Sequence, residues 1–231
     1  MADRMEIEAR MKDYYESTSQ LSLVRRMPVI IRIDGHNFKS LTKHFDKPFD
    51  TKFRAAMRST THELVRQFQG AVFAYTQSDE ISILLKDYTH LDTQAAYKNN
   101  LQKLVSLSAS YATMFFNKYM DGYGYPATFD SRAFNIPKEE VVNYFYWRQL
   151  DCKRNAIAMI GRAVAGKKAI KGLSIKEILK LLESTYNVNV ADYGLDNILG
   201  WYTSVVDGHT LRSGEACIFV GEGINIIETL L

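Results

Sequence analysis

The pattern of apolar and polar positions divides the chain into alternating helices and strands. Apolar residues recur at helical spacing in four segments, which predicts helices over residues 5–21, 50–69, 93–120 and, beginning in the turn after Pro137, up to about residue 164. Short β-branched or alternating runs predict strands over residues 29–33, 71–76, 81–85 and 128–134. Asp34-Gly35 reads as the turn that ends the first strand, and residues 77–80 read as a polar hairpin turn.

The predicted elements between residues 29 and 135 occur in the order β-α-β-β-α-β. This order is typical of a ferredoxin-like unit, an α+β fold with an antiparallel sheet and two helices on one face. A segment with two glycines around three lysines, residues 166–172, marks a boundary. We therefore predict one α+β domain over residues 1–165, with the N-terminal helix, and a C-terminal extension over residues 166–231 packed on it.

The C-terminal extension is predicted to be helical or mixed. Ser174 and Glu177 have the spacing of a capping box and predict a helix start. Residues 201–206 and 216–220 are candidate strands.

Composition narrows the class of protein. Aromatic residues make up 12% of the chain and apolar residues 46%, which excludes bulk disorder. Two cysteines exclude a disulfide framework, and the charged start of the chain lacks a signal-peptide core. No apolar run reaches the length of a membrane span. We expect a cytoplasmic protein without membrane attachment, and its formal net charge of +3 permits an anionic partner.

Carboxylates are the first candidate functional groups. Asp34 follows the first predicted strand, and Asp79 and Glu80 lie in the predicted hairpin turn. In a ferredoxin-like sheet these positions meet at one end. Carboxylates at close range repel each other unless a cation lies between them, and oxygen ligands without cysteine or paired histidine suit Mg²⁺. Two such ions would serve a nucleotidyl transfer. The alternative, that these are ordinary turn residues, stays open at this point.

Residues 35–39 follow Asp34 with a glycine and several hydrogen-bond donors. This composition favours a cradle for a triphosphate, and it lacks the Walker pattern of P-loop proteins. Lys43, His44 and Lys47 continue the positive charge along the chain, with a solvated basic loop as the alternative.

Five further segments occur in a recognisable order. They are Arg32 to Phe38 (RIDGHNF), Lys47-Pro48, Ala74 to Glu80 (AYTQSDE), Phe129 to Arg132 (FDSR) and Trp147 to Cys152 (WRQLDC). In these segments the chain resembles the tRNA-His guanylyltransferase family, including its guanylyltransferase-like branch of 3′–5′ polymerases.

The resemblance implies a polymerase-type palm that adds nucleotides to the 5′ end of tRNA, with ATP and GTP as substrates. It implies that Asp34 and Asp79 are catalytic and, with the carbonyl of Gly35, ligate two Mg²⁺ ions. It also implies a homotetramer built as a dimer of dimers. The implied nucleotide-binding residues are Asp34, Gly35, His36, Asn37, Phe38, Lys39, Lys47, Ser78 and Asp79. Candidate contacts to tRNA or triphosphate are Arg132, Lys153, Arg154 and Asn155.

The chain departs from the eukaryotic family members at residues 153–159. Those members carry the run His-Ile-Asn-Asn-Leu-Tyr-Asn, of which only Asn155 is matched here, and Lys39 stands where histidine is usual. These departures favour templated repair of 5′-truncated tRNA over the addition of a single guanosine to tRNA-His. Two alternatives remain: a nucleotide cyclase or conventional polymerase on the same palm, and a non-catalytic RNA-binding module.

Several motif residues also have structural interpretations. Arg148 and Asp151 have the spacing of an ion pair within a helix, and Asp130 with Arg132 suggests a cross-strand pair. Cys152 is expected in the core. The aromatic stretch of residues 144–147 is expected in the core or at a subunit interface.

Overall fold

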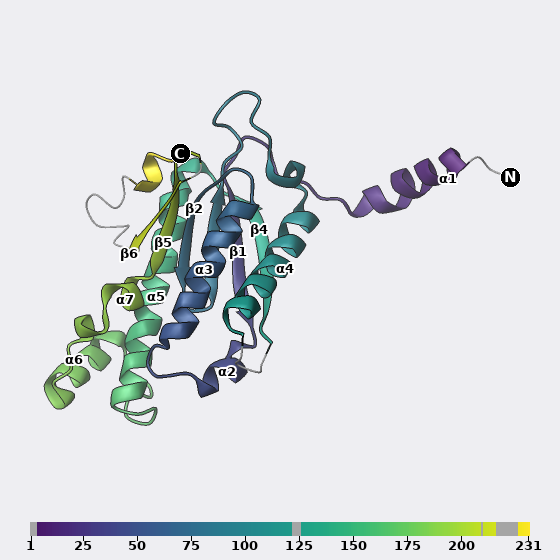
Figure 1. Cartoon of the computed structure of the whole chain (residues 1–231). Coiled ribbons are helices and arrows are strands. Elements are labelled where there is room, and N and C mark those ends of the chain that lie inside the picture. The colour runs from purple at the N-terminus through teal and green to yellow at the C-terminus, as the bar shows by residue number, and fades with distance from the viewer. Residues whose placement is uncertain (1–3, 122–125, 209, 216–225) are drawn as a thin grey trace.

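The computed structural model describes residues 4–121, 126–208, 210–215 and 226–231, and its centre is one six-stranded antiparallel sheet (Figure 1). The strand order is β4-β1-β3-β2-β5-β6. The strands are β1 (Val29–His36), β2 (Ala71–Gln77), β3 (Glu80–Leu85), β4 (Thr128–Asn135), β5 (Trp201–Val206) and β6 (Thr210–Glu215). The first four strands have the order and direction of a ferredoxin-like sheet, which confirms the predicted fold class.

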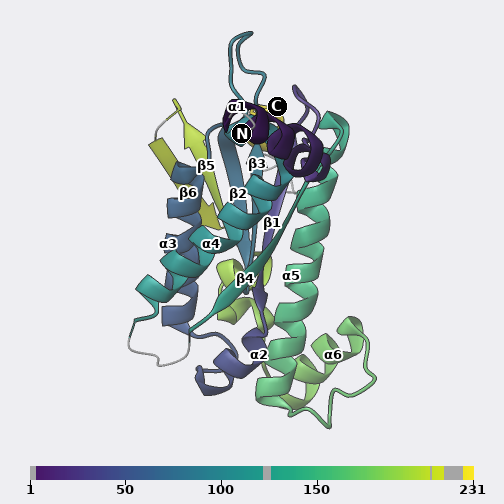
Figure 2. The same cartoon turned by 90° about the vertical axis from the view of Figure 1, so that its right-hand side faces the viewer.

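Helices cover both faces of the sheet. Figure 2 shows α3 and α4 on one side and α5 on the other. The helices are α1 (Arg4–Met11), α2 (Phe38–Leu41), α3 (Thr51–Gln67), α4 (Leu101–Tyr119), α5 (Val141–Val164), α6 (Ile175–Tyr186) and α7 (Leu195–Leu199). Because successive strand residues point to opposite faces, neighbouring isoleucines enter different cores. Ile31 packs in the cluster under α3 and α4, and Ile30 packs with Tyr144 and Phe145 of α5.

Strand β1 extends further than the sequence pattern predicts. The prediction that Asp34-Gly35 forms a turn is wrong, because β4 continues the ladder as far as the pair His36–Thr128. The hairpin turn is also shorter than predicted. Gln77 pairs with Glu80, so only two residues connect β2 to β3.

Two helices begin later than their apolar pattern predicts. Helix α4 begins at Leu101 because the side chain of Asn100 accepts a hydrogen bond from the backbone N–H of Lys103 and caps the first turn. Helix α5 begins at Val141, after a short 3₁₀ turn over Lys138–Glu140.

The C-terminal segment joins the same sheet. Strand β5 pairs with β2 and forms as predicted, and β6 follows it as the outer strand. Helix α6 begins with the predicted capping box of Ser174 and Glu177. The candidate strand at residues 216–220 lies outside the described residues. The division into two domains at residue 165 stays a prediction. The segment beyond residue 165 adds β5 and β6 to the sheet of the first segment.

The N-terminal segment projects away from the body (Figure 1). The predicted helix over residues 5–21 is helical as far as Ser19, as α1, a π-helical turn (Lys12–Glu16) and a 3₁₀ turn (Ser17–Ser19). The side chains of Tyr14 and Tyr15 are 68% and 65% exposed. The apolar residues of this N-terminal segment therefore do not contribute to the core.

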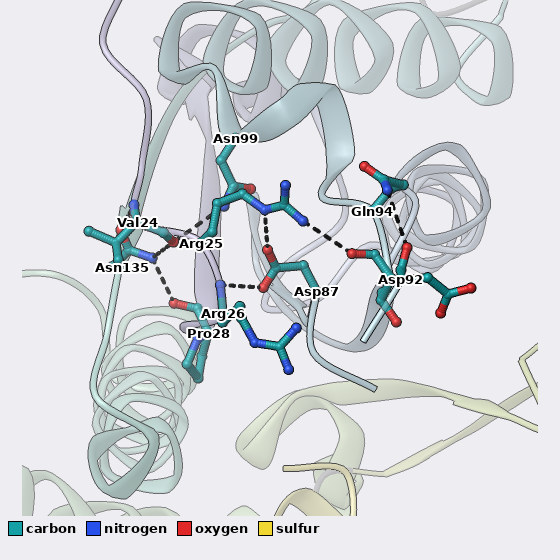
Figure 3. A network of polar contacts seen from close by, with 10 residues as sticks. Val24, Arg25, Arg26, Pro28, Asp87, Asp92, Gln94, Asn99 and Asn135 are labelled. Atoms are coloured by element: carbon teal, nitrogen blue, oxygen red, sulfur yellow. Dashed lines mark hydrogen bonds and ion pairs between the residues drawn. The ribbon is translucent and has the colours of Figure 1, made fainter. Parts of the chain in front are cut away.

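A polar network fixes the chain just before β1 (Figure 3). Buried Asp87 accepts hydrogen bonds from Nε of Arg25, at 3.0 Å, and from the backbone N–H of Arg26, at 2.9 Å. Asn135 accepts one from the backbone N–H of Val24 at 2.7 Å. This network lies where β1 begins, at the opposite end of the sheet from Asp34. It fixes the strand that carries the candidate site.

Candidate active site at the end of the central strands

The two predicted catalytic carboxylates lie at the same end of the sheet. Asp34 is on β1, in register with Glu80 of β3 on one side and Asp130 of β4 on the other. The backbone N–H of Gly35 donates a 3.0 Å hydrogen bond to the carbonyl of Asp79. The hairpin turn is thus held directly beside β1, which brings Asp79 next to Asp34 as the sequence predicts.

The electrostatics of Asp79 are those of a site that attracts a cation. Burial raises the pKa of its carboxyl, and the negative charge of Asp34 raises it further. Its own backbone N–H and the Ser78 hydroxyl act in the opposite direction. In the described ranges no group of three or more His, Cys, Asp or Glu side chains is arranged as a metal cage. Two carboxylates and a backbone carbonyl fit Mg²⁺, which completes its shell with water and phosphate oxygens.

Glu80, the third carboxylate of the predicted set, forms an ion pair with Arg148. Its Oε1 lies 2.7 Å from Nε of Arg148, and both side chains are buried. Arg148 also contacts Asp151 at 2.8 Å, and Asp151 pairs in turn with Arg154. The predicted intrahelical pair of Arg148 and Asp151 is present. Burial raises the pKa of Glu80, while Arg148 acts to lower it.

A cavity of about 650 Å³ opens beside Asp79. Its volume is in the range of small-molecule and cofactor sites. Six of the predicted nucleotide or triphosphate contacts line it: Phe38, Lys39, Lys47, Ser78, Asp79 and Asn155. Among these, the amine of Lys47 donates to the carbonyl of Thr42, and Phe38 contributes from the core, since it is 4% exposed.

Other predicted contacts lie elsewhere. His36 and Asn37 line a separate cavity of about 210 Å³ between β1 and the start of β4. Lys153, Arg154 and Arg132 line neither cavity. Arg132 pairs with Asp130 at 3.0 Å. Because both residues belong to β4, this is a pair within one strand, and the predicted cross-strand pairing is wrong.

The far wall of the 650 Å³ cavity consists of residues that sequence reasoning missed. Nη1 of Arg54 on α3 lies 2.9 Å from Asp196 and 2.7 Å from the amide oxygen of Asn197, both on α7. Arg58 also pairs with Asp196, and its guanidinium carbon is 3.9 Å from the ring centroid of Trp201. The i, i+4 spacing of the two arginines marks one helix face, but nothing in the sequence links that face to α7.

Gly35 is constrained by packing as well as by its backbone contact. A Cβ atom at this position would overlap the ring of Phe38. That ring is fixed between Phe53, Phe116 and Phe129, with centroid distances of 6.1, 5.4 and 5.0 Å. Gly35 therefore allows β1 to pass close over the aromatic core beside the carboxylates.

We expect Gly35→Ala to destabilise the fold by about 1–3 kcal/mol, the cost of overpacking a tight core, and to reduce activity. Urea denaturation would measure the first effect. Gly166→Ala serves as a control that introduces backbone strain without overpacking, because Gly166 has a positive φ and no atom lies within 4 Å of its Cβ position. Wild-type stability in Gly35→Ala would contradict the packing argument.

These features define a class of protein. A ferredoxin-like sheet that presents two adjacent carboxylates beside a nucleotide-sized cavity is the arrangement of palm-type proteins. A sequence profile described as tRNAHis guanylyltransferase matches residues 8–137, more than half of the chain. The chain belongs to the tRNAHis guanylyltransferase family, as the motifs predicted, and this is a family of tRNA nucleotidyltransferases.

Similar proteins agree with this assignment. The structure of a bacterial tRNA(His) guanylyltransferase-like protein in complex with ATP superposes with a TM-score of 0.90, at 37% identity over 97% of this chain and 98% of that one. The structure of such a bacterial protein in complex with GTP gives 0.80, at 34% identity and the same coverage. tRNA(His) guanylyltransferase 2 of Arabidopsis thaliana is 29% identical over 181 residues, 69% of this chain and 32% of that protein. This chain thus spans about a third of the length of that relative. Within the described ranges, no helix combines the length and apolar character needed to cross a membrane.

Proposed function

We propose that this protein is a Mg²⁺-dependent nucleotidyltransferase that adds nucleotides to the 5′ end of tRNA in the 3′–5′ direction. The observation that carries the proposal is the adjacency of Asp34 and Asp79, fixed by the Gly35–Asp79 backbone hydrogen bond, where Asp79 lines the 650 Å³ cavity. ATP and GTP complexes of the bacterial relatives support a nucleoside triphosphate as the ligand of this cavity.

The proposed reaction has two steps. First, an oxygen of the RNA 5′-phosphate attacks the α-phosphorus of ATP and pyrophosphate leaves. Then the 3′-hydroxyl of the incoming nucleotide attacks the adenylylated 5′-phosphate, its proton is lost to solvent, and AMP leaves. Neither step needs a protein nucleophile, so the chain's contribution is positioning and charge.

The residues divide these tasks by position. Asp34, Asp79 and the carbonyl of Gly35 would hold Mg²⁺, which supplies electrostatic stabilisation of charge at phosphorus. Lys39 and Lys47 line the cavity and can offset the charge of a triphosphate. Phe38, Phe45 and Met57 provide apolar lining for a base.

The repair branch remains our proposal for substrate choice, because residues 153–159 and Lys39 depart from the guanosine-adding pattern. If base pairing with the opposite strand of the acceptor stem selects the nucleotide, the protein needs only phosphate and shape contacts, which carry no sequence information. Assembly as a dimer of dimers and a cytoplasmic location stay predictions.

The test is an addition assay with the purified chain, ATP, all four nucleoside triphosphates and a tRNA transcript lacking its first nucleotide. We expect extension at the 5′ end by the nucleotide that pairs with the template base, and a changed product when that base is changed. Intact tRNA-His should be the poorer substrate. Guanosine addition to intact tRNA-His opposite a non-pairing base, with truncated transcripts inert, would contradict the repair proposal. Cyclic product from ATP alone would favour a cyclase.

A further inference from the structure

Trp147 is an exposed tryptophan fixed in one orientation. It lies on α5 with 51% of its surface exposed, although Tyr144 and Phe145 on the same helix are buried. Its ring meets that of Tyr144 at 65° with centroids 5.9 Å apart, and the guanidinium carbon of Arg148 lies 4.3 Å from its centroid. Arg148 is itself fixed by buried Glu80. The ring is thus supported from the protein side and open to solvent.

This ring lies beside the strand that carries Asp34. The guanidinium carbon of Arg32 on β1 is 5.9 Å from the Trp147 centroid. Asp34 is two residues further along β1 and faces the same side of the sheet. At the rise of a β-strand, two residues separate the Cα atoms of Arg32 and Asp34 by about 7 Å.

Further cationic side chains lie on the same side of the sheet as the ring. Arg32 is in register with Arg132 on the neighbouring strand, and its buried Nε has no hydrogen-bond partner. Arg154 lies two helical turns after Trp147 on the same side of α5 and is 64% exposed. Arg132 and Arg154 also contact Asp130 and Asp151 respectively. Among the described residues Arg32 forms no ion pair, although its charge acts to lower the pKa of Glu80.

This surface and the nucleotide cavity lie over different strands of the sheet. The cavity is on the β2 side of the hairpin turn, between α3, α7 and the second half of α5. Arg32 and Arg132 are on β1 and β4, at the other side of β3. Two reactants that meet at Asp34 and Asp79 therefore have separate approaches, and the nucleoside triphosphate occupies one of them.

We propose that Trp147, with Arg32 beside it, is a stacking platform for the base of the RNA's 5′-terminal nucleotide, the nucleotide whose phosphate is extended. This inference rests on the proposed function. An aromatic ring next to arginine is the usual arrangement for stacking an RNA base. Asp34 lies on the same strand and the same side of the sheet as Arg32, two residues further on. A protein partner on this face is the competing occupant, and the experiment distinguishes it.

The experiment compares the full-length wild type with Trp147→Ala and Trp147→Phe on two RNAs. One is a tRNA transcript lacking its first nucleotide, and the other is the same RNA with an abasic 5′-terminal residue. Because base stacking is sequence-tolerant and lost with the ring, Trp147→Ala should raise KM for the first RNA about tenfold or more. KM for ATP should stay within twofold, and Trp147→Phe should recover much of the loss. On the abasic RNA the wild type should already be weakened, and Trp147→Ala should add little.

Controls make each outcome decisive. Tyr186→Ala removes an aromatic residue that is 40% exposed at the end of α6 and should leave both KM values unchanged. Thermal melting confirms the fold of each variant, and light scattering gives its mass. An unchanged KM for RNA in Trp147→Ala overturns the platform. So does an equal loss on both RNAs, or a change of mass with unchanged RNA affinity per chain. If the wild type extends neither RNA, the proposed function is contradicted, and the variants then say nothing against the stacking platform.

Discussion

Replacing Asp34 or Asp79 with asparagine should abolish nucleotide addition while the fold survives. Each substitution removes a negative charge from a pair that fits Mg²⁺ and keeps the side-chain volume. The expected loss is several powers of ten in rate, on the order of 4 kcal/mol or more of transition-state stabilisation. Single-turnover addition to a truncated tRNA transcript measures it.

Thermal melting in the absence of divalent cations shows whether a loss of activity in these variants comes from a loss of folding. Burial raises the pKa of Asp79 and the charge of Asp34 adds to that shift, so Asp34→Asn relieves repulsion and should leave the melting temperature equal or higher. Asp192→Asn, in the exposed 3₁₀ turn Val190–Tyr193, is the matched control and should keep full activity. A variant of Asp34 or Asp79 that keeps a tenth of the wild-type rate would exclude that residue as a metal ligand.

Arg148→Met should be the most damaging single change to stability in the site region. It leaves the buried carboxylate of Glu80 without its hydrogen-bonded cation, and only the charge of Arg32 still acts on it. Breaking a buried ion pair in this way costs about 3–5 kcal/mol. Urea denaturation at pH 8 measures the loss. Arg154→Met is the matched control, because Arg154 contacts Asp151 from an exposed position and such pairs contribute about 0–1 kcal/mol.

The loss in Arg148→Met should depend on pH. Burial raises the pKa of folded Glu80 above its ordinary value of 4.5, and Arg148 opposes that shift. Without Arg148 the folded pKa rises further, so the folded state binds a proton that the unfolded state releases. Stability should recover as pH falls through the raised pKa towards 4.5. The double variant Glu80→Gln/Arg148→Met should show no such recovery. A loss independent of pH would mean that Glu80 is not the group left unpaired.

The sequence predicts the strands of the central sheet well because their side chains are distinctive. Residues 29–33 and 81–85 are buried except for half-buried Arg32, so these strands appear as apolar runs interrupted only by Arg32 and Ser82. The end of β1 is not predictable in the same way. Asp34-Gly35 has the composition of a turn, and the chain stays extended there because Gly35 pairs with Phe129 on β4 and donates to the carbonyl of Asp79.

Some residues of the candidate site can likewise be predicted from local sequence patterns, and others depend on tertiary packing. The positions of Asp34 and Asp79 follow from strand order, which local patterns give. The cavity wall made by Arg54, Arg58 and Asp196 depends on how α7 packs against α3. No local pattern encodes a contact between residues so distant in sequence. Glu80 likewise reads as a third candidate carboxylate until its buried contact with Arg148 is known.

The pairing of β5 with β2 has a consequence for the order of folding. Phe73 pairs with Ser204, so this ladder closes a very long loop, and such contacts form late because the loss of chain entropy precedes the gain. Strands β1 to β4 and the carboxylates can assemble first, with β2 left as an open sheet edge. The nucleotide cavity gains its wall only when the segment that carries α7 and β5 docks. A nucleotide that binds the completed cavity stabilises that docking. Nucleotide binding would then be coupled to the docking of the segment that carries α7 and β5.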